Sequence, residues 1–133
     1  YGPGTYQFSY APFQRSKFRT IITTNSGNGG NAHSEYLGPL SESGLFGMLS
    51  IVVLIFICLR KGIYIFHHEK DKNIRILSLM CTLALISYFV HGFLNNFLDT
   101  DKLAVPVFGA MAVITALDVF RKRKLKTEIY DNA

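Results

Sequence analysis

Two groups of polar side chains in this sequence have the residue types that proton transfer requires. The first is His33 with Glu35, in a loop that leads into an apolar stretch. The second is a series at four-residue spacing near the end of another apolar stretch, His91, Asn95 and Asp99. A histidine or a carboxylate within hydrogen-bond reach of a hydroxyl group can remove its proton as a general base. Both groups are therefore candidates for acid–base chemistry.

The four-residue spacing of the second group predicts that its side chains lie on one face of a helix. Polar side chains inside a membrane helix are costly, and they either serve function or bond to a neighbouring helix. Both alternatives stay open for His91 and Asn95. Because His33 and Glu35 are expected at the same depth on a separate segment, we interpret the two groups as one site. Substrate-binding roles in it are expected for Tyr36, His91 and Asn95.

A third group, Arg15, Lys17 and Arg19, is cationic, and its alternate spacing would place it on one side of a strand. Cations there would stabilise the negative charge that develops on a diphosphate leaving group. Solvated surface charge is the alternative for each of the three. Together the groups predict transfer of a sugar from a polyprenyl diphosphate, with His33 or Glu35 deprotonating or orienting the acceptor hydroxyl.

Three apolar runs must position these groups. Ile74–Leu98 alone is long enough to cross a bilayer, which takes ~20 helical residues. Gly44–Leu59 and Leu103–Phe120 reach spanning length when their flanking residues are included. A soluble bundle would carry polar residues at every third or fourth position, whereas Ile51–Leu59 carries none stronger than Cys58. The pattern predicts an all-α membrane protein with three transmembrane helices, preceded by an irregular periplasmic loop segment with a short interfacial helix.

We divide the chain into a periplasmic loop segment, a three-span membrane region and a basic cytoplasmic tail. The boundaries are residues 1–36, 37–120 and 121–133, with spans at about 37–59, 74–98 and 103–120. Asn31 is expected to cap the short interfacial helix, which begins at Ala32. A kink is expected at Gly38-Pro39, before the first span.

The positive charges predict the orientation of the spans. Of 14 Lys and Arg, five lie in Arg60–Arg75 and five in Arg121–Lys126. Short segments rich in Lys and Arg face the cytoplasm, so the C-terminus is expected there and the N-terminal segment in the periplasm, across a bacterial inner membrane. Because the charge lies beside the spans, we expect membrane lipids rather than nucleic acid as partners. Asp118 is expected to pair with the adjacent basic run.

No metal or cofactor site is predicted. His67 and His68 are adjacent and point in different directions on a helix, so together with Glu69 they are interpreted as a solvated loop. The two cysteines fall inside spans and fit neither a disulfide framework nor a metal pattern. No signal peptide or initiator Met precedes Tyr1, so we expect the C-terminal part of a longer protein, or a processed product.

The stretch AHSEYLGPLSESGLFGML resembles the signature of the O-antigen ligase and O-antigen polymerase superfamily. In that signature a His, an aromatic-Leu pair and a Glu-x-Gly-Leu-x-Gly step lead from a large periplasmic loop into a late transmembrane helix. The matching positions are His33, Ser34, Tyr36, Leu37, Glu42, Gly44, Leu45 and Gly47. Upstream, YGPGTYQFSY is similar to the family's Gly-x-Gly segment, with Gly2 and Gly4. Downstream, YFVHGFLNNFLDT is similar to its penultimate helix, with His91 and Asp99 at commonly polar positions.

The resemblance implies a metal-independent, many-span enzyme of the bacterial inner membrane. Such enzymes move glycans from undecaprenyl diphosphate to lipid A core, to a growing polysaccharide or to protein. The resemblance also implies that His33 is the critical residue and that essential arginines lie in an earlier periplasmic loop, outside this sequence. The chain would then act with the remaining spans of a longer chain or with a membrane complex. The alternative is a non-catalytic membrane subunit or remnant that binds partner proteins through its spans.

Overall fold

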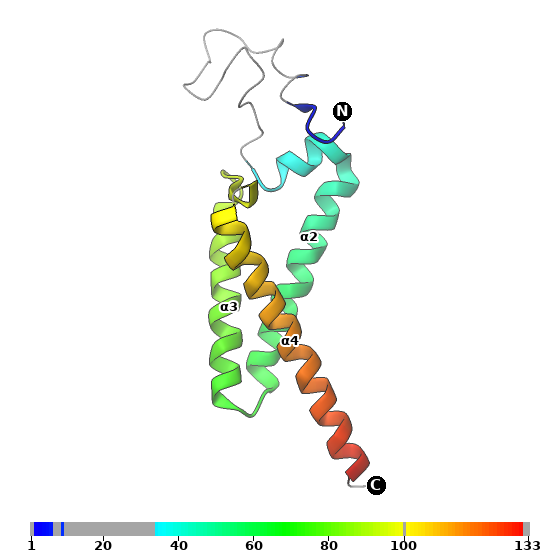
Figure 1. Cartoon of the computed structure of the whole chain (residues 1–133), viewed down its shortest axis with the longest axis vertical. Helices are drawn as coiled ribbons and strands as arrows, with labels where there is room; N and C mark the ends of the chain where they lie inside the picture. Colours follow the sequence, from blue (N-terminus) through cyan, green and yellow to red (C-terminus); the bar gives the residue numbers. More distant parts are fainter. Residues whose placement is uncertain (1, 7–8, 10–33, 100, 132–133) are drawn as a thin grey trace. The chain divides into compact units, whose positions relative to one another are not determined.

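The computed structural model describes residues 2–6, 9, 34–99 and 101–131, which form three long helices and short connections (Figure 1). The helices are α2 (Leu37–His68), α3 (Lys72–His91), the 3-10 helix η3 (Phe97–Asp99) and α4 (Asp101–Asp131). Within the described ranges there is no strand. Helices α2, α3 and α4 are each long and apolar enough to cross a membrane. The predicted all-α membrane fold with three transmembrane helices is confirmed.

Most helix ends lie beyond the ends of the apolar runs, although α3 ends before its predicted end at residue 98. Helix α2 continues to His68 and α3 begins at Lys72, so the connection is residues 69–71 rather than a loop across Arg60–Arg75. Helix α4 likewise continues through the basic run to Asp131. Lys and Arg have good helix propensity, so a helix does not have to end where its apolar window ends. The predicted boundaries mark the ends of the apolar runs and not the ends of the helices.

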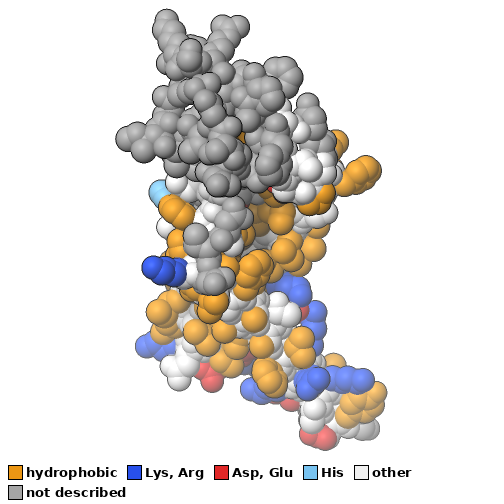
Figure 2. Space-filling model, turned by 45° about the horizontal axis from the view of Figure 1, so that its top comes forward, with side chains coloured by type: hydrophobic (Ala, Val, Ile, Leu, Met, Phe, Trp, Pro, Cys, Tyr) orange, Lys and Arg blue, Asp and Glu red, His pale blue; other side chains and the backbone are white. Residues whose placement is uncertain are grey.

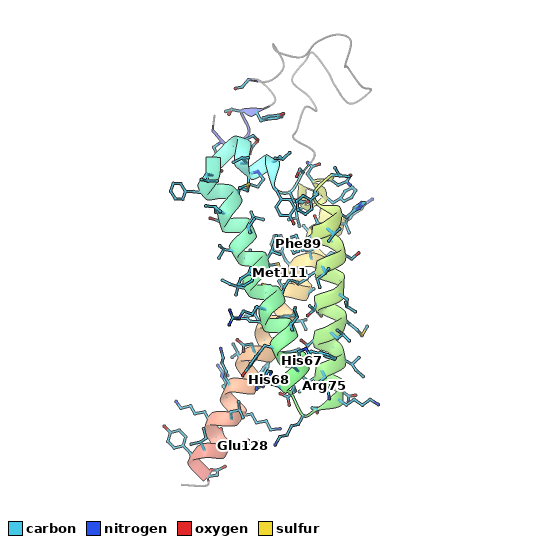
Figure 3. The ribbon with its side chains drawn as sticks, turned by 180° about the vertical axis from the view of Figure 1, so that it is seen from behind. His67, His68, Arg75, Phe89, Met111 and Glu128 are labelled. Atoms are coloured by element: carbon cyan, nitrogen blue, oxygen red, sulfur yellow. The ribbon has the colours of Figure 1, made fainter. Side chains whose placement is uncertain are left out.

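Side-chain bonds hold the short connection between α2 and α3. Asp71 Oδ1 accepts a hydrogen bond from the backbone N–H of Asn73 at 2.8 Å and so caps the start of α3. From the first turn of α3, Arg75 Nε donates to the carbonyl oxygen of Phe66 at 3.0 Å (Figure 3). The two helices are thereby joined as a tight hairpin.

A cap different from the predicted one starts α2. Ser34 Oγ accepts hydrogen bonds from the backbone N–H groups of Tyr36 and Leu37, both at 3.3 Å. This is the geometry of an N-cap serine. Asn31 and Ala32, the predicted cap and first residue of the helix, both lie outside the described residues, and the described helix begins only at Leu37. Ser34 takes the capping role because its hydroxyl lies two and three residues before the N–H groups that need an acceptor.

Helix α2 begins with a short helix, as expected, but the kink lies at Gly44 and not at Gly38-Pro39. Gly44 has φ 70° and ψ −164°, which separates residues 37–43 from residues 45–68. Pro39 instead lies in the first turn of the helix, where its missing N–H costs no intrahelical hydrogen bond. Pro39 therefore belongs to the first turn of the helix, and the helix changes direction at Gly44.

Contacts divide the chain into two compact units. They are Tyr1–Val53 with Gly92–Asn96, and Leu54–His91 with Phe97–Ala133. In the second unit α3 and α4 pack along one another, together with the part of α2 that begins at Leu54 (Figure 1). The core there includes three side chains that are fully buried, Ile65 of α2, Leu85 of α3 and Ile114 of α4. Each of the three spans thus contributes to one core.

Close contact between α2 and α3 in this unit depends on Gly62. Ser78 Oγ of α3 donates a hydrogen bond to the carbonyl oxygen of Gly62 at 2.9 Å, and Thr82 Oγ1 donates to the carbonyl oxygen of Ser78 at 2.7 Å. A Cβ atom on Gly62 would overlap Thr82 Oγ1 and lie 3.3 Å from Ile114 Cδ1. Small residues and hydroxyl groups are the usual means by which membrane helices approach closely.

The basic ends of the second unit are tied together by ion pairs. Asp118 Oδ2 lies 3.0 Å from Lys122 Nζ and 3.4 Å from Lys61 Nζ. The predicted pairing of Asp118 with the basic run is confirmed, and Lys61 of α2 joins it. Arg121 Nε lies 3.7 Å from Glu69 Oε2. On the face drawn in Figure 2, hydrophobic side chains cover much of the helices, and Lys and Arg gather along the last part of α4.

Candidate functional site

Ser34 and Glu35, which follow His33 in the chain, are hydrogen-bonded to Gly92, which follows His91. Within the first unit, the backbone N–H of Glu35 donates a hydrogen bond to the carbonyl oxygen of Gly92 at 2.9 Å. Ser34 Oγ donates to the same oxygen at 3.4 Å. Ser34 and Glu35 are both buried. One carbonyl group thus anchors the start of the motif segment.

A ring contact and a buried carboxylate complete this cluster. The rings of Tyr36 and Phe93 lie 4.5 Å apart between centroids, tilted by 30°. Glu35 is only 7% exposed. Burial raises the pKa of the Tyr36 phenol above its ordinary value of 10.0, and the negative charge of Glu35 raises this pKa further. Glu35 and Tyr36 are neighbours in the chain, so the charge of the carboxylate acts on the phenol.

This arrangement has the chemistry to hold a hydroxyl-bearing ligand. A neutral phenol donates one hydrogen bond, and carboxylate oxygens accept them. Since its pKa is raised, Tyr36 stays neutral across the physiological pH range. Asn95, which is half-buried in the same unit, adds an amide that can both donate and accept. Ser34, Glu35, Tyr36 and Asn95 are the polar residues that we take as the candidate site.

The described residues include only part of the predicted site. Of the predicted residues, four lie outside the described ranges: His33, Arg15, Lys17 and Arg19. His91 ends α3 and belongs to the second unit, where its exposed ring stacks on that of Phe97 with centroids 5.7 Å apart. Glu35, Tyr36 and Asn95 belong to the first unit.

The prediction that His91, Asn95 and Asp99 share one helical face is wrong. Helix α3 ends at His91, and Asn95 lies in the irregular stretch before η3. Glycine is a poor helix former, and Gly92 directly follows the last helical residue. Its carbonyl oxygen accepts from the motif segment, as described above, so the chain leaves the helix at this point.

Sequence reasoning missed Gly92 and Phe93, which hold the motif segment. A usable signal was present, because a glycine just after a histidine at the end of an apolar run is a common helix stop. This helix-stop signal would have placed the end of the second span at His91, seven residues before the predicted end at residue 98. The aromatic residue after that glycine had no distinguishing pattern.

The histidine pair at the end of α2 does not form a metal cluster. His68 Nδ1 donates to the carbonyl oxygen of Tyr64 at 2.9 Å, and Glu69 binds Arg121. His67 and His68 lie on the last turn of α2, so the prediction of a loop at these two residues is wrong, although both side chains are exposed (Figure 3). Across the part of the chain that the structure describes, no three His, Cys, Asp or Glu side chains are placed to hold a metal ion.

No protein-family profile matches this chain, and neither a curated protein nor a solved structure is significantly similar to it. The function therefore has to be argued from the site and from the motif that surrounds it.

We expect Glu35→Gln to lower the pKa of Tyr36 while leaving it above 10.0, because the charge is lost and the burial is kept. The ultraviolet absorbance of tyrosinate follows the titration, and subtracting a Tyr36→Phe titration isolates this phenol among seven tyrosines. Glu42→Gln, in the short helix 37–43 that follows Tyr36, is the control. The raised pKa makes the contribution of this phenol to stability complete below about pH 10, with loss as the pH rises further. An unchanged Tyr36 pKa in Glu35→Gln would contradict the arrangement.

Proposed function

We propose that this chain is the C-terminal part of an integral membrane glycosyltransferase. It moves a glycan from undecaprenyl diphosphate to a lipid, polysaccharide or protein acceptor, at the periplasmic face of a bacterial inner membrane. The docking of the motif segment carries the proposal, since Ser34 and Glu35 bond to Gly92 and Tyr36 packs on Phe93. A catalytic group needs neighbours that fix its position, and this docking supports such a role for the residue just before Ser34.

In the proposed reaction, His33 deprotonates or orients the acceptor hydroxyl, and Glu35 is the second candidate for this role. The acceptor oxygen bonds to the anomeric carbon as the bond from that carbon to the diphosphate oxygen breaks, and the acceptor proton passes to the base. Cations stabilise the charge that develops on the diphosphate. Candidates for this are Arg15, Lys17 and Arg19. The resemblance adds arginines from an earlier loop.

His33→Ala in the intact gene product is expected to lower glycan transfer at least ~100-fold, the smaller effect found on removing a general base. Transfer from a polyprenyl-diphosphate donor is measured in membranes by the change in mass of the acceptor, at matched protein levels. His67→Ala, an exposed histidine on the last turn of α2, is the control and should retain transfer. Full transfer by the His33 variant would remove His33 from the mechanism.

A second candidate function is that of a non-catalytic membrane subunit that binds partner proteins through its spans. The observation that favours it is the low burial of the spans, of which 11%, 22% and 22% of the apolar windows are buried within the chain. Such surfaces can contact lipid or other spans. A reading frame that continues upstream of Tyr1 with further spans would favour the enzyme. Lack of transfer in every assay, with stable co-purification of a membrane partner, would favour the subunit.

A further inference from the structure

A groove runs along α4 in the second unit, where α4 meets α2. It has a volume of about 600 Å³ and a mostly apolar wall, which includes Leu54 and Cys58 of α2 and Phe108, Ala112, Ala116 and Arg123 of α4. We call it the α2–α4 groove. Met111, labelled in Figure 3, is buried and also lines it. Of the described side chains that line the groove, Arg123 alone is charged.

The dimensions of the groove suit a hydrocarbon chain. From Phe108 to Phe120 the apolar wall covers about 18 Å at helical rise, close to the ~15 Å of one leaflet of a ~30 Å bilayer core. The groove is open along its length, so one extended acyl chain can lie in it with one side facing the surrounding lipid.

The charged end of the groove suits an anion. Arg121 is paired with Glu69, and Lys122 is paired with Asp118. Within the described residues, Arg123 has no acidic partner, and it follows the apolar wall directly. Basic pockets between membrane helices at the positively charged side of a membrane bind the head groups of anionic lipids.

We propose that the α2–α4 groove binds an anionic phospholipid. One acyl chain lies along the wall formed by Phe108, Ala112 and Ala116, and the phosphate lies at Arg123. A zwitterionic lipid offers the same acyl chain with a head group of no net charge. Arg123 therefore makes the groove bind the anionic lipid more tightly than the zwitterionic one. This role is independent of the proposed glycan transfer, because the groove belongs to the second unit and the candidate site to the first.

The test compares phosphatidylglycerol with phosphatidylcholine of the same acyl chains, added to the full chain in detergent. Native mass spectrometry measures the fraction of protein that retains one lipid. We expect tighter binding of phosphatidylglycerol, and an about fivefold loss of this affinity in Arg123→Gln, the effect of one basic residue. Lys124→Gln is the matched control, since Lys124 is the next basic residue and does not line the groove. The loss of phosphatidylglycerol affinity in Lys124→Gln should be smaller than in Arg123→Gln.

A second pair of variants tests the apolar wall. Ala112→Leu fills the groove and is expected to weaken binding of both lipids, whereas Ala84→Leu, at an exposed position of α3, should not. Circular dichroism checks that helical content is unchanged. Equal affinity for the two lipids, binding that Ala112→Leu leaves unchanged, or displacement of the lipid by inorganic phosphate would each overturn the proposal. So would a dimer of the chain that dissociates in Ala112→Leu, because a second copy would then be the occupant.

Discussion

Gly44→Ala is expected to destabilise the corner between the short helix 37–43 and the rest of α2 by about 1–3 kcal/mol. With φ 70° and ψ −164°, Gly44 is in a region of backbone conformation that residues with a Cβ atom hardly ever adopt. No atom lies within 4 Å of a Cβ atom placed on Gly44, so the penalty arises from the backbone and not from a clash. Thermal unfolding followed by circular dichroism, together with amide hydrogen exchange over residues 37–43, measures the effect.

Gly47→Ala tests the same corner through packing. A Cβ atom on Gly47 would lie 2.6 Å from the Cβ of Ser43 and 2.9 Å from the carbonyl oxygen of Pro39. Backbone would have to move to relieve this contact, and overpacking of this kind costs about 1–3 kcal/mol. Gly38→Ala is the control, since nothing lies within 4 Å of a Cβ there. If all three alanines had the same effect on protection, the corner would not depend on its glycines.

The Gly-Leu-x-Gly step of the motif thus has a physical explanation. Gly44 makes the turn and Gly47 allows the close approach that the turn creates. A chain that enters a membrane span from a docked surface segment needs such a corner. The two glycines are therefore explained by local structure, whatever reaction the protein performs.

Gly62→Leu is expected to separate α2 from α3 in the second unit, at a cost of about 1–3 kcal/mol for overpacking. The variant also breaks the hydrogen bond from Ser78 to the Gly62 carbonyl, a kind of bond worth ~0.6 kcal/mol between membrane helices. Thr82 cannot move aside easily, because it is β-branched and its hydroxyl is bonded to Ser78. Unfolding by a denaturing detergent, followed by helical content, measures the loss.

Two further variants identify the cause of this loss. Gly109→Ala introduces the same kind of change on α4, where nothing lies within 4 Å of the new Cβ, and should be neutral or slightly stabilising. Gly62→Ala should be partly rescued by Thr82→Ala, because the second change removes the overlapping hydroxyl. Additive effects of Gly62→Ala and Thr82→Ala would show that the two residues are not in contact.

Much of the fold was predictable because apolar runs of spanning length leave few alternatives. The three spans and the pairing of Asp118 with the basic run follow from composition and charge. The ends of α2 and α4 did not follow from hydropathy, since the charged helix formers after Leu59 and after Phe120 would have needed a propensity argument. The turn Gly2–Thr5 shows the strength of local signals. Pro3 followed by Gly4 predicts it, and Thr5 N–H bonds Gly2 O at 3.1 Å, with φ 72° at Gly4.

The candidate site was less predictable than the fold. Its predicted members Glu35 and Tyr36 lie together with Asn95 in the first unit, whereas the helical series through His91 ends at Gly92. Periodicity alone extended the helix through a glycine. The hydrogen bond of Ser34 to Gly92 joins positions 58 residues apart, and no local sequence pattern predicts a hydrogen bond between residues so distant in the chain.

The three-residue connection between α2 and α3 bears on how the protein enters its membrane. Helix α3 has the lowest mean hydropathy of the three spans, 1.7 against 2.3 and 2.1. Because the connection is so short, α3 is expected to enter the bilayer beside α2, where its Ser78 hydroxyl can bond the Gly62 carbonyl. Helix α3 also packs along α4, so the least apolar span has a neighbour in each of the other two spans.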